Sequence, residues 1–324
     1  MPAARSWPPA VAVTQGSQGE AMHRYESLRH WARVRPLHNA LRHKRQGHWY
    51  GWRWIDVLRD VERLADSLRQ HGLDHRSRLV LSGPFEPDLL LLALAAQSLG
   101  AEVASIDDQL PPDGLRQCLW RLRPSHVLVD TSQQLQDWLA ASDNGVAPRL
   151  LIVRHPGLGP VGLRRSWLAF SELAGSRGGS RCHVHWCRLA NAVQLWSEEG
   201  THWQGGLEVL LGQWLGSGHS LAFPESRRSA ARDRRQVAPS GLLLSPPRLQ
   251  RLAEEIEGYL APRDSWRQRL WAWAASHPHS ARARLLEHPM RWHLGFGRLR
   301  FVWQPVQSRR PAPAWITRFE REPG

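Results

Sequence analysis

Histidine and cysteine side chains gather in one short segment, Cys182-His-Val-His-Trp-Cys187. On a β-strand His183, His185 and Cys187 would point to the same face, and His-x-His pairs can bind zinc. No second ligand pair with a regular spacing accompanies them, and the gap is not one of the usual structural-zinc spacings. We therefore interpret the segment as a strand or loop with incidental Cys and His, and expect no metal ligands in it.

Acidic side chains follow one predicted strand as the pair Asp107-Asp108. Acidic residues at such positions often bind metals or ribose hydroxyls in α/β proteins. The nearby Pro111-Pro112 favours a plain loop and helix start instead. None of the 17 histidines combines in a readable pattern with a Ser or Cys nucleophile and an acid, and the Gly-x-Ser-x-Gly motif is absent. The sequence therefore does not support a hydrolase.

Positive charge dominates the chain, with a formal net charge of +14 and a pI near 11.2. A surface of this kind suits nucleic acid, anionic lipid or an acidic protein. Almost all of the charge is arginine, because Lys44 is the only lysine. This bias, together with the 18 Trp, is also consistent with genomic base composition, which would say nothing about partners.

Two arginine-rich regions could contact phosphates or anionic headgroups. The first is the run of Arg227, Arg228, Arg232, Arg234 and Arg235. The second is 263–310, where ten Arg and several Trp accompany only two acids, Asp264 and Glu287. A solvated helix face is the commoner explanation of the first region, and core Trp covered by arginine stems that of the second. No recognised nucleic-acid module is present.

The elements that would position these residues alternate between strands and helices. Apolar residues at three- and four-residue steps predict a helix over 54–71, ended by Gly72. Further strands are predicted at 78–82, 101–107, 126–130, 149–153, 220–223, 241–244 and 298–303. Further helices are predicted at 87–99, 112–122, 133–141, 203–215, 248–260, 265–275 and 281–292. This alternation predicts an α/β layered fold with a mainly parallel sheet and flanking helices.

Changes in composition divide the chain into five expected regions. They are a disordered extension over 1–21, a first α/β subdomain over 22–154, an irregular Gly/Arg/Ser-rich connection over 155–202, a second, incomplete α/β subdomain over 203–305, and a Pro/Arg-rich tail over 306–324. Met22 opens the first segment with folded character and is a candidate for the true start of the protein. No signal peptide is expected, and the longest apolar run, Leu89–Ala96, is too short to span a bilayer.

Disulfide bonds are not expected to stabilise this fold. Cys118, Cys182 and Cys187 are the only cysteines, which is an odd count and too few for a disulfide framework. A reducing cytoplasm fits best.

Three blocks of sequence carry a family resemblance. The first runs from Ala40-Leu-Arg-His-Lys-Arg-Gln-Gly-His-Trp49 through Trp54 and its helix to Leu94-Ala-Ala-Gln-Ser-Leu-Gly-Ala101. The second comprises Trp203, Gly218, Phe223-Pro-Glu225 and Leu244-Ser-Pro-Pro-Arg248, and the third is Leu294-Gly-Phe-Gly-Arg-Leu-Arg-Phe301. In this order and spacing they resemble AMP-forming acyl-CoA synthetases of the AMP-binding, adenylate-forming superfamily, most closely the bacterial long-chain fatty acid branch. The fold that this implies is an incomplete N-terminal domain.

The resemblance lacks the family's catalytic groups. Members carry a Ser/Thr/Gly-rich loop ending in Pro-Lys-Gly, which wraps the ATP phosphates. The nearest remnant here is Ser197-Glu-Glu-Gly-Thr201, in which Glu198 and Glu199 would repel a triphosphate. A Tyr-Gly-x-Thr-Glu motif, a ribose-binding Asp and a catalytic Lys in a C-terminal domain are expected to lie beyond this chain. Lys44 is in the wrong place to replace that Lys.

These observations lead us to expect a truncated, divergent and non-catalytic acyl-CoA synthetase-like protein. We expect no catalytic, cofactor-binding or metal-binding residues, and a cytoplasmic protein that binds an acyl ligand or a partner such as an intact synthetase or a membrane-associated complex. Alternatives are a weakly active ligase using ATP, magnesium and CoA, an arginine-mediated binder of anionic membrane or, less expected, of nucleic acid, and a decayed gene whose product folds poorly.

Overall fold

Parallel strands and crossover helices make up most of the computed structural model, which describes residues 11–12, 18–142, 146–157, 167–175, 182–183, 193–260 and 291–304. Its helices are α1 (Gln18–Val34), α2 (Trp54–Gln70), α3 (Pro87–Ser98), α4 (Pro112–Leu122), α5 (Ser132–Ala141), α6 (Phe170–Leu173), α7 (Gly206–Ser217), α8 (Ala230–Val237) and α9 (Pro246–Leu260). Its strands are β1 (Val11–Ala12), β2 (Asn39–Arg45), β3 (His48–Arg53), β4 (Arg78–Leu81), β5 (Glu102–Ile106), β6 (His126–Thr131), β7 (Leu150–His155), β8 (Trp167–Ala169), β9 (Cys182–His183), β10 (Gln194–Trp196), β11 (Ser220–Phe223), β12 (Gly241–Leu242) and β13 (Phe301–Val302).

The chain divides into two compact units, neither of them continuous in sequence. The first unit comprises Met1–Leu41, Gly51–His183 and Gly200–Gly218, and the second comprises Arg42–Tyr50, Val184–Glu199 and His219–Gly324. Each unit is described below by itself.

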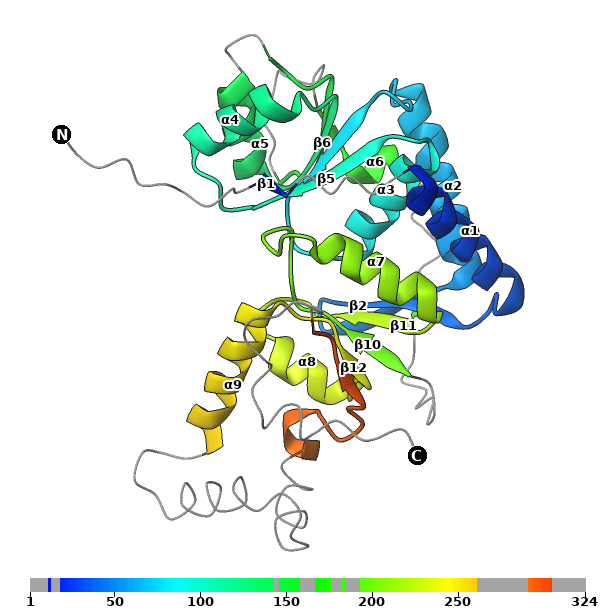
Figure 1. Cartoon of the computed structure of the whole chain (residues 1–324), viewed down its shortest axis with the longest axis vertical. Coiled ribbons are helices and arrows are strands. Elements are labelled where there is room, and N and C mark those ends of the chain that lie inside the picture. Colours follow the sequence, from blue (N-terminus) through cyan, green and yellow to red (C-terminus); the bar gives the residue numbers. More distant parts are fainter. Residues whose placement is uncertain are drawn as a thin grey trace, which may run out of the picture. The chain divides into compact units, whose positions relative to one another are not determined.

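The first unit contains a six-stranded sheet with the order β1-β5-β4-β6-β7-β8. Strands β5, β4, β6, β7 and β8 are parallel to their neighbours, whereas β1 pairs antiparallel with β5. Figure 1 shows α4 and α5 on one side of this sheet and α3 on the other. Every residue of α3 from Pro87 to Gln97 is buried, as its nearly continuous apolar sequence requires. The α/β fold and the parallel sheet predicted from the sequence are thus confirmed.

Helix α2 shows how local sequence sets packing in this unit. Most of its apolar positions at three- and four-residue steps are buried, namely Trp54, Val57, Val61, Leu64, Ala65 and Leu68, and Gly72 follows the helix with φ +83°. The Trp54 ring stacks on Trp214 with ring centroids 5.4 Å apart, and Trp31 lies 6.1 Å away on a third element. Aromatic side chains thus hold α1, α2 and α7 together within the first unit.

The second unit contains most of a seven-stranded sheet with the order β13-β12-β10-β11-β2-β3-β9. Strands β13, β12, β10 and β11 are parallel to one another. Strands β2 and β3 form a hairpin whose two turn residues, Gln46 and Gly47, both have positive φ, as a tight hairpin turn requires. The core of this unit joins Trp196, Leu242, Leu252 and Phe296 from four segments.

Gly295 illustrates why the third resembling block needs its glycines. The residue has φ +83°, and a Cβ atom there would lie 2.9 Å from the backbone of Arg234 and Arg235. Only glycine allows the segment around residue 295 to approach α8 this closely.

Several boundaries differ from the sequence-based expectation. Within the expected disordered extension, Val11–Ala12 pair with β5 and α1 begins at Gln18, before Met22. Within the expected irregular connection, Trp167–Ala169 extend the first sheet as β8. Strands β2, β3 and β10 were not predicted at all. The predicted helix 265–275, most of 281–292 and the tail 306–324 lie outside the described residues.

Candidate functional site

The carboxyl ends of parallel strands are where α/β proteins usually bind ligands, above all where the strand order reverses. In the second unit this point is β10, which has β11 on one side and β12 on the other. The residues that follow these strands are Ser197-Glu198-Glu199 after β10, Glu225 after β11 and Ser245 after β12. The segment after β10 is the one in which the sequence predicted the remnant of a phosphate loop, whereas Glu225 and Ser245 belong to the second block of resemblance.

Glu198 lies at the centre of a buried ion cluster at this point. Its side chain is 1% exposed and accepts a hydrogen bond of 3.0 Å from Trp196 Nε1. Arg248 donates to Glu198 Oε1 through Nε at 2.8 Å, and its terminal nitrogen lies 2.6 Å from the same oxygen. Arg234, 3% exposed, contributes a second guanidinium at 3.4 Å from Glu198 Oε2. The carboxylate therefore occupies a cradle made of two arginines and an indole N–H.

The two guanidinium groups respond differently to their surroundings. Burial lowers the pKa of Arg234, and the attraction of Glu198 only partly offsets it. Burial also lowers the pKa of Arg248, but hydrogen bonds and attraction from Glu255 and Glu198 outweigh it, so that its pKa is raised overall. Arg248 gains this support because it also pairs with the half-exposed Glu255 at 2.6 Å. Within the described residues, Glu198 is thus the carboxylate that pairs with the deeply buried Arg234.

The rest of the loop is also turned inward. Glu199 is buried and accepts a hydrogen bond of 2.8 Å from the backbone N–H of Ser245. Ser197 and Thr201, the two hydroxyl residues of this loop, are also buried. Glu198 and Glu199, which the sequence predicted to repel a triphosphate, are thus both engaged in contacts within the protein.

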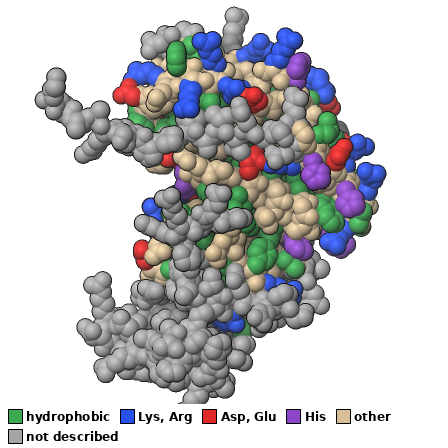
Figure 2. All heavy atoms as spheres, viewed as in Figure 1, with side chains coloured by type: hydrophobic (Ala, Val, Ile, Leu, Met, Phe, Trp, Pro, Cys, Tyr) green, Lys and Arg blue, Asp and Glu red, His purple; other side chains and the backbone are tan. Residues whose placement is uncertain are grey.

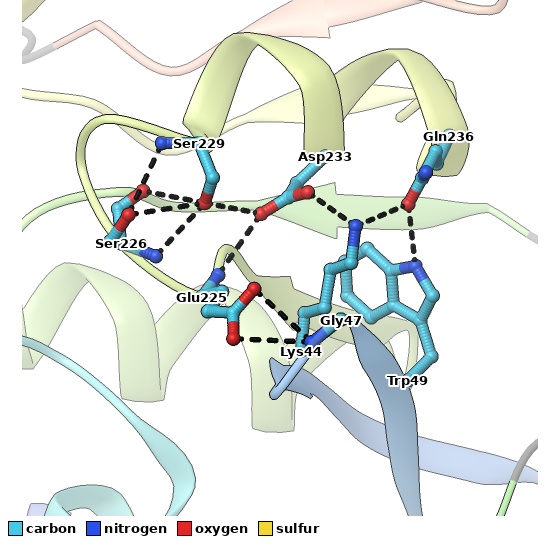
Figure 3. A network of polar contacts seen from close by, with 8 residues as sticks. All are labelled: Lys44, Gly47, Trp49, Glu225, Ser226, Ser229, Asp233 and Gln236. Atoms are coloured by element: carbon cyan, nitrogen blue, oxygen red, sulfur yellow. Dashed lines mark hydrogen bonds and ion pairs between the residues drawn. The ribbon is translucent and has the colours of Figure 1, made fainter.

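Lys44 lies in a second buried network of the same unit, drawn in Figure 3. Its ammonium group is 2.7 Å from Asp233 Oδ1 and donates to Gln236 Oε1 at 2.8 Å. The Lys44 side chain is 3% exposed and that of Asp233 is 0% exposed. The ammonium also lies 5.8 Å from the ring centroid of Trp49, which itself donates to Gln236.

Asp233 is further held from its other side. Its Oδ2 accepts hydrogen bonds from the Glu225 N–H at 3.1 Å and from the Ser229 hydroxyl at 2.7 Å (Figure 3). The carboxylate therefore joins β2, the end of β11 and α8. Sequence analysis noted Lys44 but had no signal for its partner, because Asp233 lies 189 positions away inside an arginine-rich run.

The first unit has its own reversal point, at β4 between β5 and β6. Here Arg154, with a side chain 1% exposed, pairs with Glu86 at 2.9 Å and with Asp130. Burial lowers the pKa of Arg154, but the attraction of Glu86 and Asp130 outweighs it and the pKa is raised. The end of β4 is covered by Thr201, which exchanges two hydrogen bonds of 2.9 Å with Gly83.

The other candidates from the sequence are placed as follows. Asp107 and Asp108 follow β5 in a turn, where Asp107 accepts from the Gln109 N–H at 3.0 Å. Cys182 and His183 form β9, in agreement with the strand interpretation, whereas His185 and Cys187 lie outside the described residues. Among the residues that the structure describes, no three His, Cys, Asp or Glu side chains group as metal ligands do.

The basic run at α8 is mostly the solvated face that its sequence suggested. Arg227, Arg228, Arg232 and Arg235 are exposed. Arg234 is the exception, because it is 2% exposed and its guanidinium also lies 4.9 Å from the ring centroid of Phe296. Most of the second arginine-rich region, 263–310, lies outside the described residues.

Part of the chain is similar to a known protein family. Residues 28–158 match the model of a family described as AMP-binding enzyme. This segment is similar to the AMP-binding enzyme family. The match covers β4, β5, β6 and β7 of the first sheet, and it confirms the resemblance inferred from the sequence blocks at the level of the family. Among curated protein sequences no match to the chain was found.

Solved structures extend the likeness of fold. The A-PCP didomain of carboxylic acid reductase from Segniliparus rugosus, in complex with AMP, has a TM-score of 0.63 at 14% identity, covering 95% of this chain and 51% of that one. Coronafacic acid ligase from Pectobacterium brasiliense has a TM-score of 0.58 at 11% identity, covering 75% and 53%. Acetoacetyl-CoA synthetase from Streptomyces lividans has a TM-score of 0.54 at 15% identity, covering 72% and 44%. The chain thus spans about half the length of these structures, and shares with them the fold of adenylate-forming enzymes.

Proposed function

We propose that this chain is a non-catalytic, acyl-CoA synthetase-like protein that acts by binding an acyl ligand or a protein partner. The observation that carries the proposal is the burial of Lys44, the only lysine, against Asp233 at 2.7 Å. An ammonium group held in this way cannot reach a phosphate or an acyl carboxylate without breaking a buried ion pair, which costs several kcal/mol. No other lysine stands in the segment where the family's phosphate loop is expected.

The loop after β10 supports the same proposal. A phosphate-binding loop offers free backbone N–H groups and hydroxyls to an anion. In this chain the corresponding position holds a carboxylate, Glu198, which already fills the space between Arg234 and Arg248. A nucleotide phosphate would have to displace Glu198 and leave it unpaired. We therefore expect no bound cofactor.

Calorimetric titration with magnesium ATP tests the proposal directly. The purified chain, shown to be folded by its cooperative thermal melt, should give no saturable heat at moderate salt, where nonspecific binding to arginine is weak. An intact acyl-CoA synthetase titrated in parallel should respond. Saturable binding by this chain would contradict the proposal. Titration with fatty acids in the same buffer then separates an acyl-binding role from a partner-binding role.

A Lys44→Met variant distinguishes a structural lysine from a catalytic one. Removing the ammonium leaves Asp233 buried without its cation, so we expect a loss of about 3–5 kcal/mol in the free energy of unfolding. Adding Asp233→Asn removes the stranded charge and should restore part of the stability. If Lys44→Met instead kept full stability and changed only a measured activity, the structural role assigned to Lys44 would be wrong.

A weakly active, divergent ligase is the second candidate. The match of residues 28–158 to AMP-binding enzymes, and the likeness to a domain solved with AMP, favour it. This candidate predicts pyrophosphate exchange that depends on fatty acid and magnesium ATP. Its cofactors would be ATP with magnesium and CoA.

The proposed partners follow from the family rather than from any single contact. An intact acyl-CoA synthetase or a membrane-associated complex in the cytoplasm is the partner that we propose, and nucleic acid is the least favoured. No helix in the described part of the chain combines the length and apolar character needed to cross a membrane. Co-purification of the tagged chain with a synthetase from the same cells would support the partner role.

A further inference from the structure

The end of α1 and the turn that follows it expose aliphatic side chains to solvent. Val34 is 57% exposed and Leu37 is 68% exposed, and both belong to the first unit. They stand among exposed basic residues, and we call this group the α1 tip surface. Its members are Arg29, His30, Arg33, Val34, Arg35, Leu37 and His38.

The arginines of the α1 tip surface form no ion pair with a carboxylate in the part of the chain that the structure describes. Arg33 donates only to the backbone carbonyl of Arg29, at 3.4 Å, and Arg35 lies 5.1 Å from the ring centroid of Trp31. Neither contact involves a carboxylate. Between Met22 and His38 the sequence contains a single acid, Glu26. The surface therefore joins three positive groups to two aliphatic side chains.

Exposed arginines on other helices of the same unit are arranged differently. Arg59 pairs with Asp56 at 3.6 Å, Arg69 with Asp66 at 2.7 Å, and Arg116 of α4 with Asp113 at 2.6 Å, each across one helical turn. Such pairs neutralise a helix surface locally. Among the described residues, the α1 tip surface has no arginine–carboxylate pair of this kind, so an external anion is its natural complement. In Figure 2, Lys/Arg and His side chains gather on the side that carries α1.

We propose that the α1 tip surface docks the protein on an anionic lipid surface. Leu37 and Val34 enter the headgroup region, where burial of aliphatic side chains is favourable, while the three arginines bind lipid phosphates. Nucleic acid fits less well, because its bases stack on aromatic rings, and the aromatic ring nearest the tip, Trp31, is already covered by Arg35 and bonded to Leu215 O at 2.6 Å. The inference does not depend on whether the protein is catalytic.

Vesicle co-sedimentation with the full chain tests the proposal. The chain should bind phosphatidylcholine vesicles that contain phosphatidylglycerol, and should bind pure phosphatidylcholine weakly. Changing Arg29, Arg33 and Arg35 together to Gln should weaken binding on the order of a hundredfold, at about fivefold for each arginine. Changing Val34 and Leu37 to Ser should weaken it about tenfold at unchanged net charge.

The matched control changes three exposed arginines of the α8 region, Arg228, Arg232 and Arg235, to Gln. It removes the same charge and should leave most of the binding to anionic vesicles intact. Equal loss in the control and in the arginine variant of the tip would overturn the proposal, because binding would then follow net charge alone. A thermal melt confirms that each variant is folded.

Two other results would assign the surface to a different occupant and overturn the proposal. The first is that the aliphatic variant loses affinity for an RNA or DNA oligonucleotide while vesicle binding is unchanged. The second is that the wild-type chain is a dimer in solution and the aliphatic variant a monomer, which would make the surface a contact between copies of the chain.

Discussion

The two sheets hold charge at their carboxyl ends in opposite arrangements. In the first unit one arginine, Arg154, lies between Glu86 and Asp130, whose side chains remain 14% and 20% exposed. In the second unit one carboxylate, Glu198, lies between two arginines and is 1% exposed. Both positions are reversal points of a parallel sheet, where α/β proteins usually leave room for a ligand. In this chain an ion cluster occupies the reversal point of each sheet.

The difference in exposure should decide how much each cluster contributes to stability. A buried charge that loses its partner cannot be hydrated, whereas a partly exposed one can. The acidic side chains around Arg154 retain access to water, but Glu198 and Arg234 do not. The second cluster is therefore the more rigid structural element, and the first is the place where solvent or a small cation can still reach the carboxylates.

Of the two clusters, the second is expected to show the larger effect, on the change Glu198→Ala. This change leaves Arg234 buried without a carboxylate and removes the acceptor of the Trp196 N–H, so it should lower the free energy of unfolding by about 3–5 kcal/mol. Chemical denaturation of the variant measures the loss. Glu255→Gln is the matched control, because Glu255 is 51% exposed and its pair with Arg248 should contribute less than about 1 kcal/mol. Similar effects of the two changes would show that burial does not distinguish them.

A smaller effect is expected for Arg154→Met in the first unit. The variant leaves two carboxylates close together, but both can take up water, so we expect a loss of about 2 kcal/mol. Arg154→Lys should recover only part of the stability, since an ammonium group cannot bond two carboxylates in the manner of a guanidinium. Chemical denaturation measures both variants, and full recovery of stability by Arg154→Lys would contradict this account.

Much of the fold could be predicted because its signals are local. The apolar steps of α2 and the continuous apolar run of α3 each identify one helix without reference to the rest of the chain. The alternation with short apolar strands then implies parallel pairing. The β2–β3 hairpin was missed because β2 contains Arg42, His43 and Lys44, which are buried despite their polarity. A polar sequence carries no strand signal when its partners are remote.

The ion clusters could not be predicted for the same reason. Lys44 meets Asp233 across 189 positions, and Glu198 meets Arg248 across 50. Sequence analysis therefore interpreted Glu198 by its sign alone, as a group that repels phosphate. The structure gives it an arginine partner at each carboxylate oxygen. The composition showed that the chain is rich in arginine, but only the fold separates the buried Arg234 from its exposed neighbours.

The smallest expected effect concerns the opposite end of the first sheet, where the ion pair of Arg78 with Glu102 is partly exposed. His126 begins β6 with 0% exposure, next to Ser125 Oγ at 2.9 Å and His71 O at 3.3 Å. Burial lowers the pKa of His126 below its ordinary value of 6.5. The unfolded chain therefore takes up a proton at a higher pH than the folded one does. Stability should be constant above about pH 7 and fall on acidification from about pH 6.5 down to the lowered pKa.

Measurement of the free energy of unfolding between pH 8 and pH 5 checks this expectation, with a slope from one histidine of at most about 1.4 kcal/mol per pH unit. His126→Gln should remove that part of the slope, and His23→Gln, at an exposed position, controls for loss of an imidazole. The same slope in wild type and His126→Gln would mean that the imidazole is hydrated in the folded state. Loss of the slope in His126→Gln would instead show that a neutral buried imidazole makes the stability of the first sheet depend on pH. The buried ion cluster of the second sheet contains no histidine, so its contribution to stability should not change over this range of pH.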